Sequence, residues 1–121
     1  MSAQRNERFP KSARLVSPKD FDRVFKSGIV ASDSVLVIHA CRRNDEPTRL
    51  GLSISKRVGN SPQRNLWKRL IRESFRKQKM DLPVGLDIVV RPKKGALPEY
   101  AAIFESLPRL CKQLHNRLRT P

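Results

Sequence analysis

The stretch KRVGNSPQRNLWKRLIRESFRKQ, from Lys56 to Gln78, mixes large apolar residues with many cations, and Glu73 is its one acid. At 100° per residue, a helix over residues 62–80 separates the two kinds of residue. Six cations fall within an arc of roughly 140°, and the apolar residues fall on the opposite side. The cations of this arc, called here the cationic stripe, are Arg64, Lys68, Arg69, Arg72, Arg76 and Lys79, and the opposite face holds Leu66, Trp67, Leu70, Ile71, Ser74 and Phe75. The sequence therefore predicts one amphipathic helix, with an apolar face for a sheet and a cationic face for a partner.

The rest of the chain is also strongly basic. Its 121 residues include 26 Lys or Arg and 11 Asp or Glu, which gives a formal net charge of +15. Such a charge repels itself in a compact chain unless a polyanion neutralises it. A solvated charged face usually mixes both signs, whereas the stripe contains no acid, so the pattern favours a polyanionic partner.

The apolar face of the predicted helix distinguishes nucleic acid from an anionic membrane surface. A membrane-surface helix inserts its apolar face into lipid. Here predicted strands flank the helix on both sides in the sequence, and the apolar face is required to cover them. The longest strongly apolar run, Val35 to Ile38, has four residues and is too short to cross a bilayer. We therefore expect a nucleic-acid partner and no membrane contact.

The two cysteines bear on the compartment. Cys41 and Cys111 are 70 positions apart and form no C-x-x-C pair. This spacing favours free thiols, buried or half-buried, over a zinc site or a disulfide framework. The N-terminal residues lack the apolar segment of a secretion signal. The sequence therefore predicts a cytoplasmic protein.

The length suits a single domain covering residues 1–121. Residues 1–13 are polar and basic without periodicity, and we expect them to form a flexible arm. A short helix is predicted next from an N-cap, a proline in the first turn, a capping-box acid and a terminator, which are Ser17, Pro18, Asp20 and Gly28.

The remaining pattern predicts an α+β fold in the order α-β-β-β-α-β-α. Three strands are expected between Ile29 and Ser55, the last two as an antiparallel hairpin across the turn sequence RNDEPT. A fourth, mostly buried strand runs from Leu86 to Pro92. A C-terminal helix begins near Pro98, and Pro108 is expected to kink it or break it in two. One mixed four-stranded sheet with helices packed on it, a sandwich, is the predicted architecture.

The stripe and the loop before it both favour phosphate binding. Arginine supplies four of the six stripe cations, which suits bidentate contacts to phosphates. In the loop sequence VGNSP, Gly59 allows an unusual backbone turn and Ser61 is the expected N-cap. Free N–H groups at the helix start would then lie beside Lys56 and Arg57 and attract an anion.

The sequence GLSISKRVGNSPQRNLWKRLIRESFR resembles the signature of the bacterial ribonuclease P protein family. In this signature a strand is followed by a basic glycine loop and then by R-N-x-x-K-R-x-x-R-E. The segment ARLVSPKDFDRVFKSG is similar to the first helix of the family, and LDIVVRPKKG is similar to its last strand. The resemblance implies a protein that joins a catalytic RNA and precursor transfer RNA in a complex that removes 5′ leaders. It also implies a left-handed β-α-β crossover, against the usual right-handed preference.

In this family the RNA carries the active site and its Mg²⁺ ions. The sequence agrees, because it has no H-x-E or H-x-x-x-H motif, no paired carboxylates at a glycine turn and no serine with a matching base. His39 and His115 are isolated in a strand and a helix. We therefore expect no catalytic residue, metal or bound cofactor in this chain, and no obligate protein partner.

The resemblance also assigns two sets of binding residues. Those that would contact the catalytic RNA are Lys56, Arg57, Arg64, Asn65, Lys68, Arg69, Arg72 and Arg76. Those in or near a cleft for the single-stranded leader, between the first helix and the sheet, are Arg14, Phe21, Phe25, His39, Ser53 and Ser55. Aromatic faces accept any base, so stacking there needs no sequence readout. From the residues alone, Phe21 and Phe25 fit a core position equally well.

Two positions depart from the family pattern. Leu66 stands where the motif normally has a third cationic residue, which removes one expected phosphate contact. His39 occupies a strand position that is often aromatic in relatives, which weakens one expected stacking site. Neither departure removes the stripe.

Two other classes of nucleic-acid-binding protein compete with this interpretation. A ribosomal or other structural RNA-binding protein without an associated enzyme would share the basic helix and sheet. A helix-turn-helix DNA-binding protein fits less well, because the cationic helix lies between strands and no short partner helix precedes it.

Overall fold

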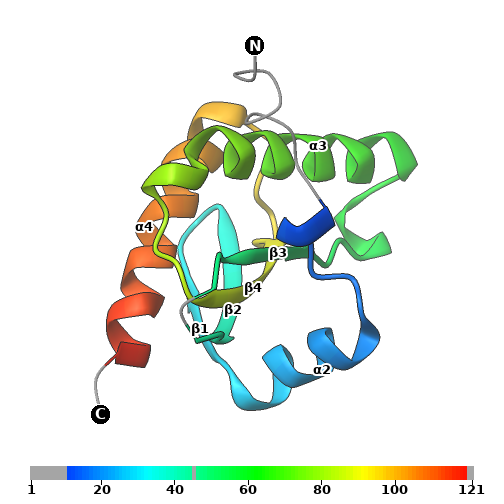
Figure 1. Ribbon diagram of the computed structural model, residues 1–121. Coiled ribbons are helices and arrows are strands. Elements are labelled where there is room, and N and C mark those ends of the chain that lie inside the picture. Colours follow the sequence, from blue (N-terminus) through cyan, green and yellow to red (C-terminus); the bar gives the residue numbers. More distant parts are fainter. Residues whose placement is uncertain (1–10, 45, 120–121) are drawn as a thin grey trace.

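The computed structural model describes residues 11–44 and 46–119 (Figure 1). Most of the predicted arm lies outside this part. Its last residues, Lys11–Ala13, form a single 3₁₀ turn, η1, and Ala13 is buried. Residues 11–13 therefore belong to the folded part of the chain.

The order of helices and strands agrees with the predicted α-β-β-β-α-β-α pattern. The main elements are α2 (Pro18–Ser27), β1 (Ile29–Ser32), β2 (Leu36–Arg42), β3 (Arg49–Leu52), α3 (Ser61–Gln78), β4 (Leu86–Pro92) and α4 (Tyr100–Arg119). Two further 3₁₀ turns flank α3, η2 (Lys56–Val58) before it and η3 (Lys79–Asp81) after it. Among the described residues, no helix is long and apolar enough to cross a membrane.

The four strands form one mixed sheet in the order β1-β2-β4-β3. β2 pairs antiparallel with both β1 and β4, and β3 pairs parallel with β4. The predicted hairpin of the second and third strands is therefore wrong, since β4 lies between them and the hairpin is formed by β1 and β2. Residues 86–90 of β4 are all buried, which is the pattern of a strand covered on both faces and placed inside a sheet. The β3–α3–β4 crossover joins neighbouring parallel strands, and its left-handed sense stays a prediction.

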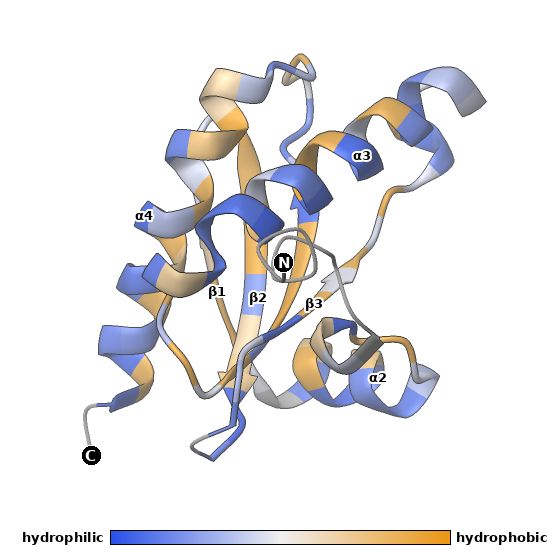
Figure 2. Cartoon of the chain, turned by 45° about the horizontal axis from the view of Figure 1, so that its top comes forward, coloured by the Kyte–Doolittle hydropathy of each residue, from blue (hydrophilic) through white to orange (hydrophobic). Residues whose placement is uncertain are grey.

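The sheet lies between two layers of helices (Figure 1). α3 and α4 cover one face, and their apolar residues join those of the strands in the main core. Apolar and polar bands alternate along α3 in Figure 2, as expected for a helix with one buried face. α2 covers part of the other face, where Leu15, Val24, Cys41 and Val89 form a separate, smaller cluster with Phe21 packed against it.

The caps of α2 and α3 differ in detail from the predictions. Ser17 caps α2 as expected, accepting a hydrogen bond from the N–H of Lys19 at 3.2 Å, and Gly28 ends the helix. The Asp20 carboxylate does not complete a capping box, because it faces Arg23 and Arg49, at 3.3 and 3.7 Å.

The N-cap of α3 is Asn60, one residue before the predicted Ser61. Asn60 and Gln63 form a reciprocal capping box, with hydrogen bonds of 2.9 and 3.0 Å. Ser61 is the first helical residue, and its hydroxyl accepts a hydrogen bond from Arg64 instead.

Pro108 lies within α4, and the helix is continuous from Tyr100 to Arg119, so the predicted break into two helices does not occur. A proline has no N–H to donate to the carbonyl four residues earlier, here that of Phe104. That carbonyl instead accepts a hydrogen bond of 3.0 Å from the Gln78 side chain. A side chain of α3 thus satisfies the backbone group that Pro108 leaves unpaired and ties the two helices together.

Asp33 connects the β1–β2 turn to α4. Its carboxylate accepts hydrogen bonds from the N–H groups of Val35 and Leu36 and from the Ser106 hydroxyl, and it pairs with Arg109. Burial alone would raise the pKa of Asp33, but these hydrogen bonds outweigh it and lower the pKa from 3.8 to about 2. Asp33 therefore stabilises the fold at pH values above its ordinary pKa.

We expect this contribution, about 2 kcal/mol, to disappear as the pH falls from 3.8 through about 2. Asp33→Asn should therefore be less stable than the parent protein at neutral pH, and the difference should shrink toward zero at about pH 2. Urea denaturation across this range measures both. Asp22→Asn is the matched control, because Asp22 is an exposed carboxylate paired with Lys26 on α2 and should change stability by less than about 1 kcal/mol. A stability difference for Asp33→Asn that does not vary with pH would contradict the assignment.

Candidate nucleic-acid interface

The cationic stripe follows the solvent side of α3. Trp67, Ile71 and Phe75 are buried on the opposite side of the helix, with Leu66 and Leu70 half-buried beside them. Arg69 and Arg72 are exposed, and the stripe residues Arg64, Lys68 and Arg76 are half-buried. Lys79 is the exception, because α3 ends at Gln78 and Lys79 begins η3. The predicted separation of apolar and cationic faces is otherwise confirmed.

The stripe cations differ in their neighbours. Arg76 pairs with Glu73 at 2.6 Å, so its charge is partly neutralised. Arg64 turns back along the chain and donates to the Gly59 carbonyl at 2.8 Å and to the Ser61 hydroxyl at 3.0 Å. In the part of the chain that the structure describes, Lys68, Arg69 and Arg72 have no carboxylate within ion-pair distance. These three cations form the part of the stripe that is most available to an external anion.

The loop before α3 places two more exposed cations, Lys56 and Arg57, at the start of the stripe. Gly59 has a φ of 155°, and a Cβ there would lie 2.0 Å from the Gln63 side-chain oxygen, so this close turn requires glycine. The capping box uses the N–H groups of Asn60 and Gln63, and Pro62 has none. The helix start therefore offers fewer free N–H groups to an anion than predicted, and the side chains of Lys56 and Arg57 remain its main cationic feature.

A second group of candidate residues lies on the sheet face that α2 covers only in part. Phe25 is 42 % exposed and packs edge-on against His39, with 4.8 Å between ring centroids. Arg91, on the neighbouring strand β4, donates from Nε to His39 Nε2 at 3.1 Å. An aromatic ring, an imidazole and a guanidinium thus form one continuous surface patch.

Phe21 and Phe25, one turn apart on α2, have different environments. Phe21 is half-buried against the small cluster, and a Cβ on Gly51 of β3 would lie 2.8 Å from its ring. Gly51 therefore allows Phe21 to lie directly on the strand. Phe21 is largely a packing residue that borders the patch, whereas Phe25 presents its ring to solvent.

Burial lowers the pKa of His39 below its ordinary value, and the positive charge of Arg91 lowers it further. His39 is therefore neutral at neutral pH. Because Nε2 accepts the hydrogen bond from Arg91, the imidazole proton must be on Nδ1. The half-buried imidazole is thus a neutral ring beside the exposed ring of Phe25, and such a pair suits stacking with a base.

The other three predicted cleft residues lie beside β3 or just after it, and of these only Ser55 shares a groove with Arg91. Ser53 is half-buried just after β3, and its N–H donates to the Val90 carbonyl. Arg14 forms an isolated bridge with Leu50 at the free edge of β3. The Ser55 hydroxyl accepts a hydrogen bond from the N–H of Arg57 and lies in a groove shared with Arg91 and the loop after β4.

A family model described as Ribonuclease P matches residues 9–115. The chain belongs to this family. A ribonuclease P protein component from Brevibacillus brevis is 37% identical over 105 residues, which are 85% of this chain and 83% of the relative. Membership gives the protein its role in 5′ maturation of transfer RNA, as a subunit of an endoribonuclease. It does not favour the alternative of a structural RNA-binding protein without an enzyme.

Solved structures of ribonuclease P proteins share this fold. That from Staphylococcus aureus superposes with a TM-score of 0.75 at 32% identity, covering 85% of this chain and 95% of that one. That from Thermotoga maritima gives a TM-score of 0.74 at 31% identity, covering 83% and 96%. The predicted α+β architecture is thereby confirmed for this ribonuclease P protein.

The structure adds three cations to the predicted interface of this ribonuclease P protein. Arg91 contacts His39, and Lys93 and Lys94 line the groove that contains Ser55 and Arg57. Arg91 could have been predicted from the alternation of side chains along β4. It lies two residues after Val89 and four after Asp87, so the three side chains face the same side of the sheet. Leu66, at the position of the missing cation, borders a shallow hollow with Pro62, Asn65 and Arg69.

Proposed function

We propose that the protein contributes two RNA-binding surfaces to ribonuclease P. The cationic stripe, extended by Lys56 and Arg57, binds the catalytic RNA subunit. The patch around Phe25, His39 and Arg91 binds the single-stranded 5′ leader of precursor transfer RNA. The complex then removes the leader.

The observation that supports binding of the catalytic RNA is the division of α3 into two faces. Its apolar face is buried in the protein's own core, so it is not available to a membrane or to a partner protein. Its solvent face holds Lys68, Arg69 and Arg72, with no carboxylate partner among the described residues. Cations arranged in this way match phosphates spaced along an RNA backbone.

The second half is supported by the composition of the patch. An exposed phenyl ring and a neutral imidazole provide stacking surfaces for bases, and Arg91 provides a positive charge for the RNA phosphates between these bases. Such a surface binds single strands with little sequence preference. It therefore fits leaders that differ in sequence from one precursor to the next.

The proposal assigns bond cleavage, and the Mg²⁺ ions that support it, to the RNA. The half-buried carboxylate of Asp33 and the fully buried one of Asp87 are both bound by arginines of the chain itself and serve its structure. Reconstitution tests this assignment. Adding the protein to the catalytic RNA at low Mg²⁺ should stimulate precursor cleavage, because the protein neutralises phosphates that otherwise require metal ions. An equal cleavage rate with and without the protein would overturn the proposal.

Phe25→Ala should weaken binding of a leader-bearing precursor to the complex by about 1 kcal/mol or more, since one stacking surface is lost. Combining it with Phe21→Ala should increase the loss. Binding of mature transfer RNA, which has no leader, should not change. Phe104→Ala is a matched control, because Phe104 is 38 % exposed on α4 and should affect neither ligand. Equal losses for precursor and mature transfer RNA would place the leader elsewhere.

A further inference from the structure

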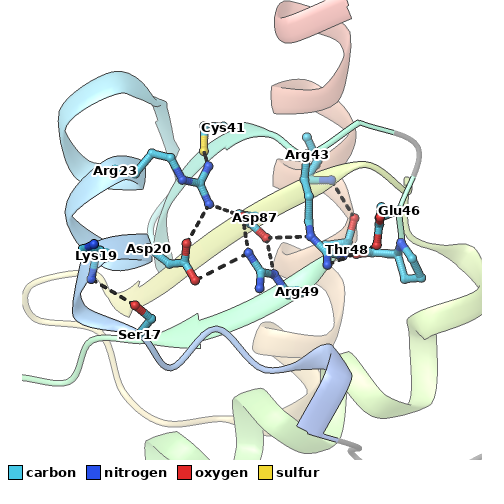
Figure 3. A network of polar contacts seen from close by, with 12 residues as sticks. Ser17, Lys19, Asp20, Arg23, Cys41, Arg43, Glu46, Thr48, Arg49 and Asp87 are labelled. Carbon is cyan, nitrogen blue, oxygen red and sulfur yellow. Dashed lines mark hydrogen bonds and ion pairs between the residues drawn. The ribbon is translucent and has the colours of Figure 1, made fainter.

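A polar network joins α2 to the sheet (Figure 3). At its centre the Asp87 carboxylate on β4 is fully buried. Arg49 of β3 donates to both of its oxygens, each at 2.8 Å, and Arg23 of α2 donates to one of them. Arg43 lies 3.7 Å from the other oxygen. The group formed by Asp20, Arg23, Arg49 and Asp87 is called here the Asp87 clasp.

Arg23 connects α2 to more than one strand. Besides its bond to Asp87, it donates to the Cys41 sulfur on β2 at 2.7 Å and pairs with Asp20 on its own helix at 3.3 Å. Asp20 in turn lies 3.7 Å from Arg49. The clasp therefore attaches one helix to β2, β3 and β4 together.

The clasp and the aromatic residues occupy opposite flanks of α2. Val24 is fully buried and marks the side of the helix that faces the sheet. At 100° per residue, Asp20 and Arg23 lie on one flank of Val24. Phe21 and Phe25 lie on the other. A rotation of α2 about its axis that opens the clasp would therefore also move both phenyl rings relative to His39.

The apolar contacts beneath α2 fix this rotation only weakly. The cluster around Val24 is small and separate from the main core, and apolar packing has little directional preference. Paired guanidinium and carboxylate groups, in contrast, require a specific geometry. The clasp is thus a strongly directional contact between α2 and the sheet.

From this geometry we infer that the Asp87 clasp is a positioning device that sets the distance and angle between Phe25 and His39, and hence the affinity for the leader. The inference rests on the proposed function of that patch. Because Asp87 is fully buried, it acts through α2 and does not touch RNA.

The test uses the protein reconstituted with the catalytic RNA and compares affinities for leader-bearing precursor and mature transfer RNA. Asp87→Asn should lower the ratio of precursor affinity to mature transfer RNA affinity about fivefold to tenfold, which is the effect of weakening one stacking contact. Adding Phe25→Ala to Asp87→Asn should lower it little further, because both changes act on the same contact. Asp33→Asn is the control for stability, because it breaks a carboxylate–arginine contact at α4, away from α2, and should leave the ratio unchanged.

Asp87→Asn could prevent folding, which circular dichroism would detect. Arg23→Gln then replaces it, since Arg49 still pairs with Asp87 in that variant. Lys26→Gln is its matched control, removing one cation from the same helix outside the clasp. A reduced ratio with Arg23→Gln and not with Lys26→Gln supports the inference.

An unchanged ratio in the folded clasp variant, together with a reduced ratio for Phe25→Ala, would overturn the inference and leave the proposed function intact. Equal reductions for Asp87→Asn and Asp33→Asn would also overturn it, because general loss of stability would then explain both. An unchanged ratio for Phe25→Ala would overturn the proposed leader site itself.

Discussion

Raising the salt concentration from about 50 to about 200 mM is expected to weaken binding of the protein to the catalytic RNA roughly a thousandfold. Each cation that contacts a phosphate releases condensed counterions, and added salt opposes that release. Six candidate contacts have no carboxylate partner among the described residues, namely Lys56, Arg57, Arg64, Lys68, Arg69 and Arg72. A titration of labelled RNA at several salt concentrations measures the slope of affinity against salt.

Changing Lys68 and Arg72 together to alanine should reduce that slope by about the contribution of two phosphate contacts. The affinity at low salt should fall more than tenfold. The matched control removes Lys112 and Arg119, which are exposed on α4 outside the stripe. If the charge of the whole protein mattered more than its position, the two double variants would lose affinity equally. Such a result would contradict the assignment of the stripe.

Much of the fold could be predicted because local signals agreed with the tertiary structure. The 3.6-residue period of Trp67, Ile71 and Phe75 identified α3, and Ser17 with Gly28 bounded α2. Strand pairing could not be predicted in the same way. The second and third strands are close in sequence and suggest a hairpin, but residues 86–90, which are apolar except for Asp87, are buried best between them. A short distance in sequence favours pairing of β2 with β3, whereas burial of a long, mostly apolar strand favours placing β4 between them.

The candidate site was predictable where it depends on helical angle and not where it depends on side-chain conformation. The angular positions of Lys68, Arg69 and Arg72 placed them on the solvent face. No pattern predicts that Arg64 turns back to the Gly59 carbonyl. Helical spacing allows Glu73 to pair with Arg69, Arg76 or Lys77 and does not decide between them, because long side chains have many rotamers of similar energy.

The clasp was missed, although the sequence contained a signal for it. Asp87 lies within the apolar sequence LDIVV, and a carboxylate in a buried strand requires cationic partners. Those partners, Arg23 and Arg49, are 64 and 38 positions away. The need for partners could be inferred from the sequence, but their identity depends on how α2 and β3 meet β4.

Trp67→Ala is expected to lower the free energy of unfolding by about 3 to 5 kcal/mol. Trp67 is 1 % exposed and belongs to the main core, where α3 meets the sheet and α4, so truncation removes apolar contacts and leaves a cavity. A domain of this size has a total stability of about 5 to 15 kcal/mol, so the loss would be a large part of it. Urea denaturation followed by circular dichroism measures the change, because Trp67 is the single tryptophan and its fluorescence is lost with it.

Arg69→Ala, two residues further along the same helix, should leave the stability almost unchanged and weaken RNA binding. Arg69 is exposed, so its removal should change stability by less than about 0.5 kcal/mol while weakening RNA binding through one lost phosphate contact. Trp67→Ala should weaken RNA binding only as far as it populates unfolded chains, and excess RNA should restore it. The two variants together separate the face of α3 that holds the fold from the face that binds RNA. A stable Trp67→Ala protein, or an unstable Arg69→Ala protein, would show that α3 is oriented differently and that the cationic stripe does not face the RNA.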